Sequence, residues 1–396
     1  MNFLFPYLAR WRTVNWTRYH QIFTRLANRG HDVYVLQPPA SNMAETNFQE
    51  IQVEVPERLH LIEVPVNDVM WQARLPFNKL LKKGYYAVRC SSRIDALMKE
   101  TRIDALMLYN IPQYHMMEYP CVTIFDYADD YLDMLRKELG PAANGPVMGL
   151  ANRMLRKMIQ RADLVLAVAH VLAQDIRRWN PVVEVLPNGA SLDEFDSRST
   201  PVPRIEALGQ GPVIGFIGSF EYFVDFDLML EVAQRLSRLT FLLVGGGREL
   251  EGVRQQVRDR GLTNVVLTGS VPHSEIAGHI AQMDVCLNIF KKMPVSHGAC
   301  PLKLFEYLIM KKPVVTTRLR EVEKIDKGFV FYGDTAAEVA QQIEFILENP
   351  AVGQAYALRG QETTLRDYDW NRIVDRLLDL VREAQVSRLQ RSNRAV

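Results

Sequence analysis

Short runs of apolar residues alternate along this chain with longer stretches in which apolar residues recur every three or four positions. The short runs predict buried strands, and the periodic stretches predict amphipathic helices. Alternation of strand and helix through a whole chain is typical of α/β architecture with parallel sheets. The predicted strands are 2–8, 33–36, 105–108, 122–126, 164–167 and 183–186 in the first half, and 213–217, 240–244, 265–268, 285–289, 314–316 and 329–331 in the second.

A stretch without sustained periodicity separates the two series of strands. Residues 191–212 hold acidic residues, prolines and two glycines, as a linker does. We therefore predict Rossmann-like domains at 1–190 and 213–368, facing one another across a cleft. Because open parallel sheets bind ligands at the carboxyl ends of their strands, the cleft is the expected site.

The last segment, residues 369–396, carries one more amphipathic stretch. We predict a helix near 370–385 that packs back on the first domain. Beyond it, Arg388, Arg391 and Arg394 are expected to form a frayed basic tail.

The bulk composition excludes several classes of protein. The chain has 396 residues, 48% of them hydrophobic, and a net charge of +1, which suits a soluble globular protein and argues against a dedicated nucleic-acid binder. No apolar run reaches the roughly 18 residues that span a bilayer, and the N-terminus does not resemble a signal peptide. We expect a cytoplasmic protein. The four cysteines have no metal-binding spacing and are expected to be reduced.

The run from Pro301 to Leu308 is the most informative motif. Proline fits the first position of a helix, and the open N–H groups at a helix start attract phosphate. Lys303 would add a positive charge there. Glu306 lies on the same face about 4.5 Å further along the helix axis, where its carboxylate could accept hydrogen bonds from ribose hydroxyls. The pattern therefore predicts a clamp for a nucleotide sugar.

A structural interpretation of the same run stays open. Leu302, Phe305, Leu308 and Ile309 recur at helical spacing. They would equally suit an amphipathic core helix with its lysine and glutamate solvated.

Several motifs occur together in an informative order. They are Gly215-Phe216-Ile217-Gly218-Ser219, Leu242-Leu243-Val244-Gly245-Gly246-Gly247, Leu267-Thr268-Gly269-Ser270-Val271-Pro272, Asp284-Val285-Cys286-Leu287-Asn288 and Lys303-Leu304-Phe305-Glu306-Tyr307, followed by Pro313-Val314-Val315. With this order the second half resembles the donor domain of a GT-B glycosyltransferase. The first half resembles that family's acceptor domain at 162–167 and 186–195. Phe125-Asp126-Tyr127-Ala128-Asp129-Asp130-Tyr131 is similar to a segment of the teichuronic-acid and xanthan glucuronosyl enzymes of bacterial polysaccharide synthesis.

The resemblance implies a metal-independent hexosyl- or glycuronosyltransferase. It would move a sugar from a nucleotide diphosphate donor, with UDP favoured, to a saccharide acceptor that is often lipid-linked. The reaction would take place at the inner face of the cytoplasmic membrane, in the assembly of surface polysaccharides or glycoconjugates. It needs no metal and no cofactor besides the nucleotide-sugar co-substrate.

Carried over to this chain, the resemblance names a set of donor-binding residues. They are Lys303, Glu306 and the helix start at Leu302, with Ser219, Gly245, Gly246, Val271 and His297. Glycine lets the backbone approach a phosphate or sugar closely. A Gly triplet after a strand is also an ordinary turn, and that alternative stays open.

The chain departs from the family pattern at two positions. Retaining members carry a Glu-x7-Glu pair, and here Gly298 occupies the place of the first glutamate. Members also place a cation after the first strand of the donor domain, whereas residues 219–222 contain none. Sugar recognition would then use other groups of the Ser296-His297-Gly298 loop.

Three residues are candidates for the acid–base chemistry. Asp126 follows an apolar strand, at the position where the xanthan-type enzymes have a general base, and a carboxylate can remove the acceptor's proton. Asp129 and Asp130 instead suit a helix N-terminus. His115 and His170, which also follow predicted strands, are the other candidates, although lone histidines are often structural.

Asp225 and Asp227 match the D-x-D spacing by which another glycosyltransferase fold holds a metal. They also precede a predicted helix at 228–236, where capping acids belong. We predict capping and no metal site.

Two basic surfaces suit an anionic membrane face as well as ordinary solvated helices. One contains Arg74, Lys79, Lys82, Lys83, Tyr85, Tyr86, Arg89 and Arg93, and the other Arg153, Arg156, Lys157 and Arg161. Because the resembled enzymes use lipid-linked acceptors, an anionic membrane surface is an expected partner.

Two rival functions are compatible with these motifs. A UDP-sugar 2-epimerase shares the two-domain fold and would convert its substrate without an acceptor. A non-catalytic accessory subunit is suggested by Gly298 and by the missing cation near Ser219.

Overall fold

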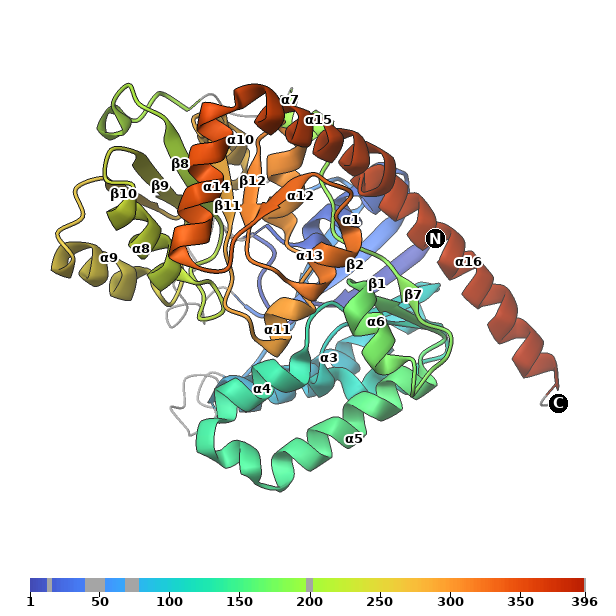
Figure 1. The fold of residues 1–396 in the computed structure, drawn as a ribbon. Coiled ribbons are helices and arrows are strands. Elements are labelled where there is room, and N and C mark those ends of the chain that lie inside the picture. Colours follow the sequence, from blue (N-terminus) through green and yellow to red (C-terminus); the bar gives the residue numbers. More distant parts are fainter. Residues whose placement is uncertain (13–15, 40–53, 68–77, 197–201, 395–396) are drawn as a thin grey trace. The chain divides into compact units, whose positions relative to one another are not determined.

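The computed structural model describes residues 1–12, 16–39, 54–67, 78–196 and 202–394. The chain forms two compact units (Figure 1). Unit 1 comprises residues 1–187 and 373–396, and unit 2 comprises residues 188–372. Within the described ranges, no helix combines the length and the apolar character required to cross a bilayer.

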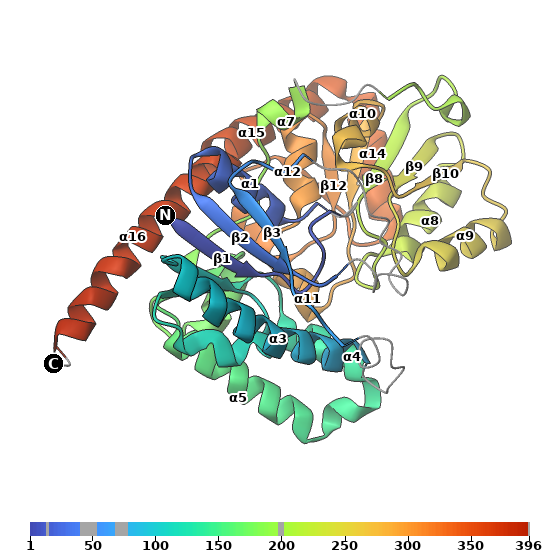
Figure 2. The same cartoon turned by 180° about the vertical axis from the view of Figure 1, so that it is seen from behind.

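Unit 1 is built on a seven-stranded parallel sheet, part of which Figure 2 shows from behind. Its strand order is β3-β2-β1-β4-β5-β6-β7, so the order reverses at the β1/β4 pair. The strands are β1 (Asn2–Pro6), β2 (Asp32–Gln37), β3 (Leu59–Glu63), β4 (Ala105–Leu108), β5 (Val122–Tyr127), β6 (Leu164–Ala167) and β7 (Glu184–Val185).

The helices of unit 1 cover this sheet with their apolar faces. Helix α1, for example, buries Ile22, Phe23 and Leu26, and the Phe23 ring lies 4.6 Å from that of Phe5 in β1. The described helices are α1 (Arg18–Asn28), α3 (Asn78–Glu100), η2 (Ile111–Glu118), α4 (Tyr131–Leu139), η3 (Gly140–Asn144), α5 (Pro146–Arg161), α6 (His170–Ile176) and, from Ile373 onward, α16 (Trp370–Arg394).

Unit 2 repeats the design with six parallel strands in the order β10-β9-β8-β11-β12-β13, reversing at the β8/β11 pair. The strands are β8 (Val213–Ile217), β9 (Thr240–Val244), β10 (Val265–Gly269), β11 (Val285–Asn288), β12 (Val314–Thr316) and β13 (Val330–Tyr332). The helices are α7 (Leu192–Asp196), η4 (Glu206–Leu208), α8 (Phe226–Arg235), α9 (Leu250–Asp259), η5 (His273–Glu275), α10 (Ile276–Ala281), α11 (Pro294–His297), α12 (Leu302–Ile309), α13 (Arg320–Ile325), α14 (Ala336–Glu348) and α15 (Pro350–Asp367).

The predicted α/β class with parallel sheets is confirmed. One strand was not predicted: β3 is an edge strand in which only Leu59 is buried, so it lacks an apolar run. The segment predicted as a linker contains α7 and η4, and by its contacts it belongs to unit 2.

The C-terminal arginines differ from the expected frayed tail. Helix α16 continues to Arg394, and Arg388 and Arg391 both donate to the carboxylate of Asp163, at 2.5 and 3.0 Å. Asp163 also accepts hydrogen bonds from the backbone N–H and the hydroxyl of Thr123 in β5. These arginines therefore attach the last turns of α16 to the sheet of unit 1.

The Asp163→Asn substitution is expected to destabilise unit 1 by about 2–4 kcal/mol, because it removes the charge that two arginines share at a largely buried position. The Asp163 side chain is only 6% exposed. Urea unfolding followed by circular dichroism would measure this change. Asp379→Asn is the matched control, because Asp379 is 58% exposed and pairs with Arg382 within α16. The control should change stability by less than about 0.5 kcal/mol, and equal effects of the two substitutions would contradict the anchoring role of Asp163.

Candidate functional site

Helix α12 is fixed against the sheet of unit 2 by a buried phenol. The Tyr307 hydroxyl accepts a hydrogen bond of 2.7 Å from the backbone N–H of Ile217, the last residue of β8. The Phe305 ring stacks on Tyr368 at 4.5 Å on another side of the helix. With these two contacts made, the remaining face of α12, which carries Lys303 and Glu306, lies at the carboxyl end of β8.

Lys303 occupies the point where the strand order of unit 2 reverses. Its ammonium lies 4.1 Å from the centre of the Phe216 ring in β8 and 5.0 Å from that of Phe290, which follows β11. Burial lowers the pKa of Lys303 to about 7, and the Glu306 carboxylate opposes that shift. A cation held against two aromatic rings has lost part of its hydration. An anionic ligand could replace that hydration.

Glu306 lies one helical turn after Lys303. Burial raises its pKa to about 7, the Lys303 charge opposes the rise, and Glu194 of α7 adds to it. The sequence motif therefore forms a partly desolvated pair of opposite charges. Phe305, Leu308 and Ile309 are buried, as the core-helix interpretation predicts, while Lys303 and Glu306 are half-buried, so their contact with a donor stays a prediction.

The start of α12 leaves backbone donors open. The helix begins at Leu302, one residue later than predicted, so Pro301 is its N-cap rather than its first helical residue. No side chain caps this end of the helix. The preceding turn is held in place because the Asn188 amide donates to the carbonyl of Cys300 at 2.6 Å. The helix can therefore offer N–H groups to an anion beside Lys303.

Glycines let the loops after β8 and β9 approach one another and Lys303. Gly218 has a φ of +134°, and a Cβ there would lie 2.7 Å from the Lys303 side chain. Gly245 has a φ of +136°, and its Cβ would lie 1.9 Å from the Gly218 carbonyl oxygen. A side chain at either position would separate the loops. Close backbone approach, rather than an ordinary turn, therefore explains these two glycines.

The other predicted donor residues surround the same strand ends. Ser219 is exposed directly after Gly218, and Val271 is half-buried after β10. A Cβ on Gly246 would clash with the Ser270 hydroxyl at 2.2 Å. Ser219, Gly246 and Val271 thus follow three adjacent strands, and their contact with a donor remains a prediction.

The structure adds Arg248, which the sequence analysis did not single out. It follows the Gly triplet, and its guanidinium lies 3.4 Å from the carboxylate of Glu221 in the loop after β8. Arg248 therefore brings a positive charge to the loop in which the family's usual cation is missing. Its position directly after the glycine triplet is the sequence feature that could have identified it as a candidate.

The loop with Gly298 in place of the first glutamate presents His297. The Nδ1 atom of His297 accepts from the backbone N–H of Arg320 at 3.4 Å, so in the neutral ring Nε2 carries the proton. Burial lowers the His297 pKa, and the charges of Arg320 and Lys292 lower it further. A neutral imidazole with a proton on Nε2 can donate a hydrogen bond to a sugar oxygen.

Asp126 is fully buried at the end of β5. Its two carboxylate oxygens accept from the Arg18 guanidinium at 3.0 and 3.1 Å. Arg18 also donates to the carbonyl of Leu186. Burial raises the pKa of Asp126 and the Arg18 charge opposes the rise. Both oxygens are occupied and neither is exposed, so this arrangement suits a structural ion pair better than a proton acceptor.

The two acids that follow have different roles. Asp130 is the N-cap of α4, where its side chain accepts from the backbone N–H of Asp133 at 3.1 Å, as predicted. Asp129 is not the cap and its side chain is exposed. Partial desolvation raises the pKa of Asp129 to about 7, the charge of Arg18 opposes the rise, and the Asp126 and Asp130 carboxylates add to it.

The two candidate histidines lie in different surroundings. His115 is in the 3₁₀ helix η2, where a loop was expected, and its Nε2 forms a 2.8 Å hydrogen bond with the Ser91 hydroxyl of α3. His170 is the first residue of α6, exposed near the carboxyl end of β6. His170 therefore lies nearer to a strand end than His115 does.

The D-x-D acids are engaged in structural contacts. Asp225 is the N-cap of α8 and accepts from the backbone N–H of Leu228 at 3.1 Å. Asp227 forms an ion pair of 2.9 Å with Arg260. Among the described residues, no group of three or more His, Cys, Asp or Glu side chains could hold a metal ion.

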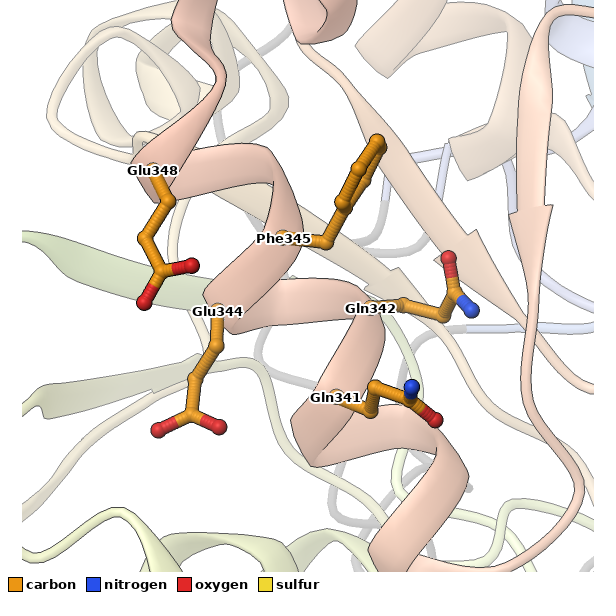
Figure 3. Close-up of a pocket in the computed structure, with 5 residues that line it drawn as sticks. All are labelled: Gln341, Gln342, Glu344, Phe345 and Glu348. Carbon is orange, nitrogen blue, oxygen red and sulfur yellow. The ribbon is translucent and has the colours of Figure 1, made fainter.

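One surface hollow lies apart from these residues. It is lined by one helix, α14, through Gln341, Gln342, Glu344, Phe345 and Glu348 (Figure 3). None of the predicted donor-binding residues contributes to it, and we assign it no role.

The Gly218→Ala substitution is expected to lower the stability of unit 2 by about 1–3 kcal/mol, because alanine disfavours the positive φ and its Cβ displaces Lys303. Denaturant unfolding would measure this. Gly252→Ala in α9 is the control, since no atom lies within 4 Å of its Cβ and alanine favours a helix. That control should be neutral or slightly stabilising, and a Gly218→Ala protein as stable as the wild type would contradict the close approach.

Comparisons with known families agree with this architecture. Residues 17–194 match the family described as Glycosyltransferase Family 4, and residues 211–349 match Glycosyl transferases group 1. The chain is 30% identical over 227 residues to the putative teichuronic acid biosynthesis glycosyltransferase TuaH of Bacillus subtilis. That match covers 54% of this chain and 55% of TuaH, so the chain spans about half the length of this relative.

Two further proteins broaden the comparison. The chain is 23% identical, over 61% of its length and 67% of the relative's, to the GDP-mannose-dependent alpha-(1-6)-phosphatidylinositol monomannoside mannosyltransferase of Mycobacterium tuberculosis. The structure of Anabaena HepE in complex with UDP and glucose superposes with a TM-score of 0.67 at 14% identity, covering 95% of this chain and 98% of HepE. The latter likeness shows the fold alone. The two family regions cover most of the chain, one for each unit, and the chain belongs to the GT-B glycosyltransferases of the group 1 and family 4 type.

Proposed function

We propose that this glycosyltransferase moves a sugar from a nucleotide diphosphate donor to a saccharide acceptor. The observation that carries the proposal is the position of Lys303, held against Phe216 beside the uncapped start of α12, with Glu306 one turn further on. Holding an ammonium against aromatic rings costs hydration energy, and a diphosphate would compensate for it. Glu306 would accept hydrogen bonds from the ribose.

UDP is the favoured nucleotide of the proposal. HepE, whose fold is similar, has been solved with UDP, whereas the mycobacterial relative is named for GDP-mannose. The base would be contacted by backbone near Val271, where side chains carry little information about the nucleotide. Direct binding measurements are therefore needed to identify the nucleotide of the donor.

The proposed acceptor is a saccharide attached to a lipid, reached from the cytoplasmic side of the membrane. This rests on relatives named for teichuronic acid biosynthesis and for a phosphatidylinositol mannoside. In the proposed transfer the acceptor oxygen bonds to the anomeric carbon while the bond from that carbon to the diphosphate breaks. The departing diphosphate keeps the electron pair, and Lys303, Arg248 and the start of α12 stabilise its charge without a metal.

The acceptor proton needs a carboxylate that a hydroxyl can reach. Asp126 was the first choice from the sequence, but both its oxygens are held by Arg18. Asp129 lies three residues further on, exposed and unused as a cap. We therefore assign the proton acceptor to Asp129, and assign Asp126 and Arg18 to holding the end of β5 in place.

Binding of UDP, GDP and ADP, measured by calorimetry with and without manganese, tests the donor site. One nucleotide should bind with a micromolar dissociation constant that manganese leaves unchanged. Glu306→Ala and Lys303→Met should each weaken binding at least tenfold, because each removes one end of the clamp. Glu348→Ala is the control, because Glu348 lines the hollow on α14 to which none of the predicted donor-binding residues contributes, and it should leave binding within twofold of the wild type.

The pH dependence of that binding follows from the two pKa values near 7. Above pH 7 Lys303 loses its proton and its attraction for the diphosphate. Below pH 7 Glu306 gains a proton and accepts hydrogen bonds less well. Affinity should therefore peak near neutral pH.

Absence of binding by all three nucleotides would reject the enzyme proposal in favour of an accessory subunit. Conversion of a UDP-sugar without acceptor would favour the epimerase.

The base assignment predicts that Asp129→Asn lowers the transfer rate by about 10²–10⁴ while nucleotide affinity is kept. Radiolabelled sugar transfer to membrane-extracted acceptor would measure the rate. Asp130→Asn is the matched control, because asparagine caps a helix about as well as aspartate, and it should largely keep both the stability and the transfer rate. The assignment would be contradicted if Asp129→Asn stayed active while Asp126→Asn folded but did not transfer sugar. Asp126 would then be the proton acceptor.

A further inference from the structure

An ion pair links the loops that follow β8 and β9 in unit 2. These two strands are neighbours in the sheet (Figure 1). Glu221 lies in the loop after β8 and Arg248 in the loop after β9, and the Nε atom of Arg248 is 3.4 Å from a carboxylate oxygen of Glu221. A Cβ on Gly218, three residues before Glu221, would collide with the Lys303 side chain. The ion pair therefore belongs to the same strand ends as Lys303.

Glu221 is unexpected in a loop that borders an anion site. Residues 219–222 contain no cation, although the resembled family places one after this strand, and the charge that they do contain is negative. A carboxylate close to a diphosphate would repel it. Arg248 supplies the missing positive charge, so Glu221 needs a role other than direct contact with the ligand.

The ion pair is not required to hold the two loops together. The backbone N–H of Gly218 donates to the carbonyl of Val244 at 3.0 Å, and that of Phe220 donates to the carbonyl of Gly246 at 2.9 Å. The Phe220 carbonyl in turn accepts from the backbone N–H of Glu249 at 3.0 Å. These backbone hydrogen bonds fix both loops whether or not the two charged side chains meet.

The contact between the two side chains is weak and accessible to solvent. The Arg248 side chain is 66% exposed and the Glu221 side chain is 21% exposed. Their separation is longer than a strong charge-assisted hydrogen bond, which measures about 2.7–2.9 Å, and exposed ion pairs contribute little to stability. In the part of the chain that the structure describes, Glu221 is the ion-pair partner recorded for Arg248. Rotation of one side chain is therefore enough to change that partner.

We propose that Glu221 is a positioning residue that holds Arg248 in the ligand-free protein and releases it to the diphosphate of the nucleotide. When the nucleotide binds, the Arg248 guanidinium donates to phosphate oxygens, with which arginine forms a stronger, bidentate pair. When the diphosphate leaves after transfer of the sugar, Glu221 binds Arg248 again. The inference rests on the proposed donor site, because that site provides the ligand.

This exchange of partners sets the affinity for the nucleotide. The diphosphate must displace the Glu221 carboxylate, so the nucleotide binds less tightly than it would to an unpaired Arg248. A weaker complex releases the product nucleotide faster, and product release limits the turnover of many enzymes. The carboxylate therefore favours turnover at the expense of nucleotide affinity.

The basic residues that the sequence analysis grouped around α3 form no comparable pair at a strand end. Tyr86 is buried in the core, and Arg89 donates to the carbonyl of Pro65. Arg74 lies outside the described residues, and the side chain of Lys79 is not described either. The pair of Glu221 and Arg248 is the more specific arrangement.

Calorimetric titration of the full chain with UDP and with inorganic pyrophosphate, which lacks a base, tests the proposal. Glu221→Gln should raise the affinity for both ligands about threefold or more, because the amide keeps the shape of the side chain but no longer holds the arginine. Glu221→Ala should act in the same direction. Arg248→Met should lower the affinity about fivefold or more.

A double-mutant cycle isolates the exchange. In the Arg248→Met protein, the further change Glu221→Gln should alter UDP affinity by less than about 1.5-fold, because the carboxylate then has no arginine to hold. Uridine, measured in competition with UDP, has no phosphate and should bind the wild type and Glu221→Gln equally well.

Glu344→Gln is the matched control. Glu344 also pairs with an arginine, Arg238, at 2.8 Å. Arg238 precedes β9, so this pair lies toward the amino ends of the strands, opposite to Arg248. Glu344→Gln removes the same charge from unit 2 and should leave UDP affinity within about 1.5-fold of the wild type.

Three results would overturn the proposal. They are unchanged UDP and pyrophosphate affinity in Glu221→Gln, an equal gain of affinity when Arg248 is already methionine, and an equal gain for uridine. Wild-type UDP binding that Glu221→Gln leaves unchanged rejects the exchange and keeps the donor site. Absence of binding by the wild-type and Glu221→Gln proteins alike rejects the donor site as well.

Discussion

The hydrogen bond between Tyr307 and the end of β8 determines where the chemistry of unit 2 is placed. A buried phenol without a partner would cost about 1–3 kcal/mol, so helix α12 has one favourable position against the sheet. In that position Lys303 lies over Phe216, and the start of the helix faces the end of β8. The positive charges of the proposed donor site therefore depend on a contact made by a residue that would not touch the donor.

Two further features shape the surroundings of Lys303. The glycines after β8 and β9 allow backbone to pack on backbone, and a Cβ on Gly218 would collide with the Lys303 side chain. The partial loss of water around Lys303 and Glu306 brings both pKa values to about 7, so each can change protonation at neutral pH. The incomplete solvation of these two charges lowers the stability of unit 2. Binding of an anionic ligand beside Lys303 would recover part of that stability.

Unit 1 uses its charges differently. The Arg18 guanidinium joins Asp126 at the end of β5 to the carbonyl of Leu186. Asp163 accepts hydrogen bonds from two arginines of α16. These buried or half-buried pairs hold elements that are far apart in sequence. The cations of α5, by contrast, are exposed at the surface of unit 1. The same residue types thus form buried ion pairs that join distant elements in one place and lie exposed on a helix in another.

The sequence alone was sufficient for the α/β class, for the two series of strands and for the order of motifs that indicated the family. Those properties depend on local periodicity, which each strand and helix carries in its own residues. It also singled out Lys303 and Glu306, because their spacing within one helix is a local property, and their role in donor binding stays a prediction. It missed β3, whose edge position leaves only one residue buried, and it misjudged the C-terminal arginines, whose partner Asp163 is more than two hundred residues away. Only the tertiary structure paired Asp126 with Arg18, left Asp129 exposed and brought Arg248 to Glu221, because these relations depend on which strand ends become neighbours in the folded sheet.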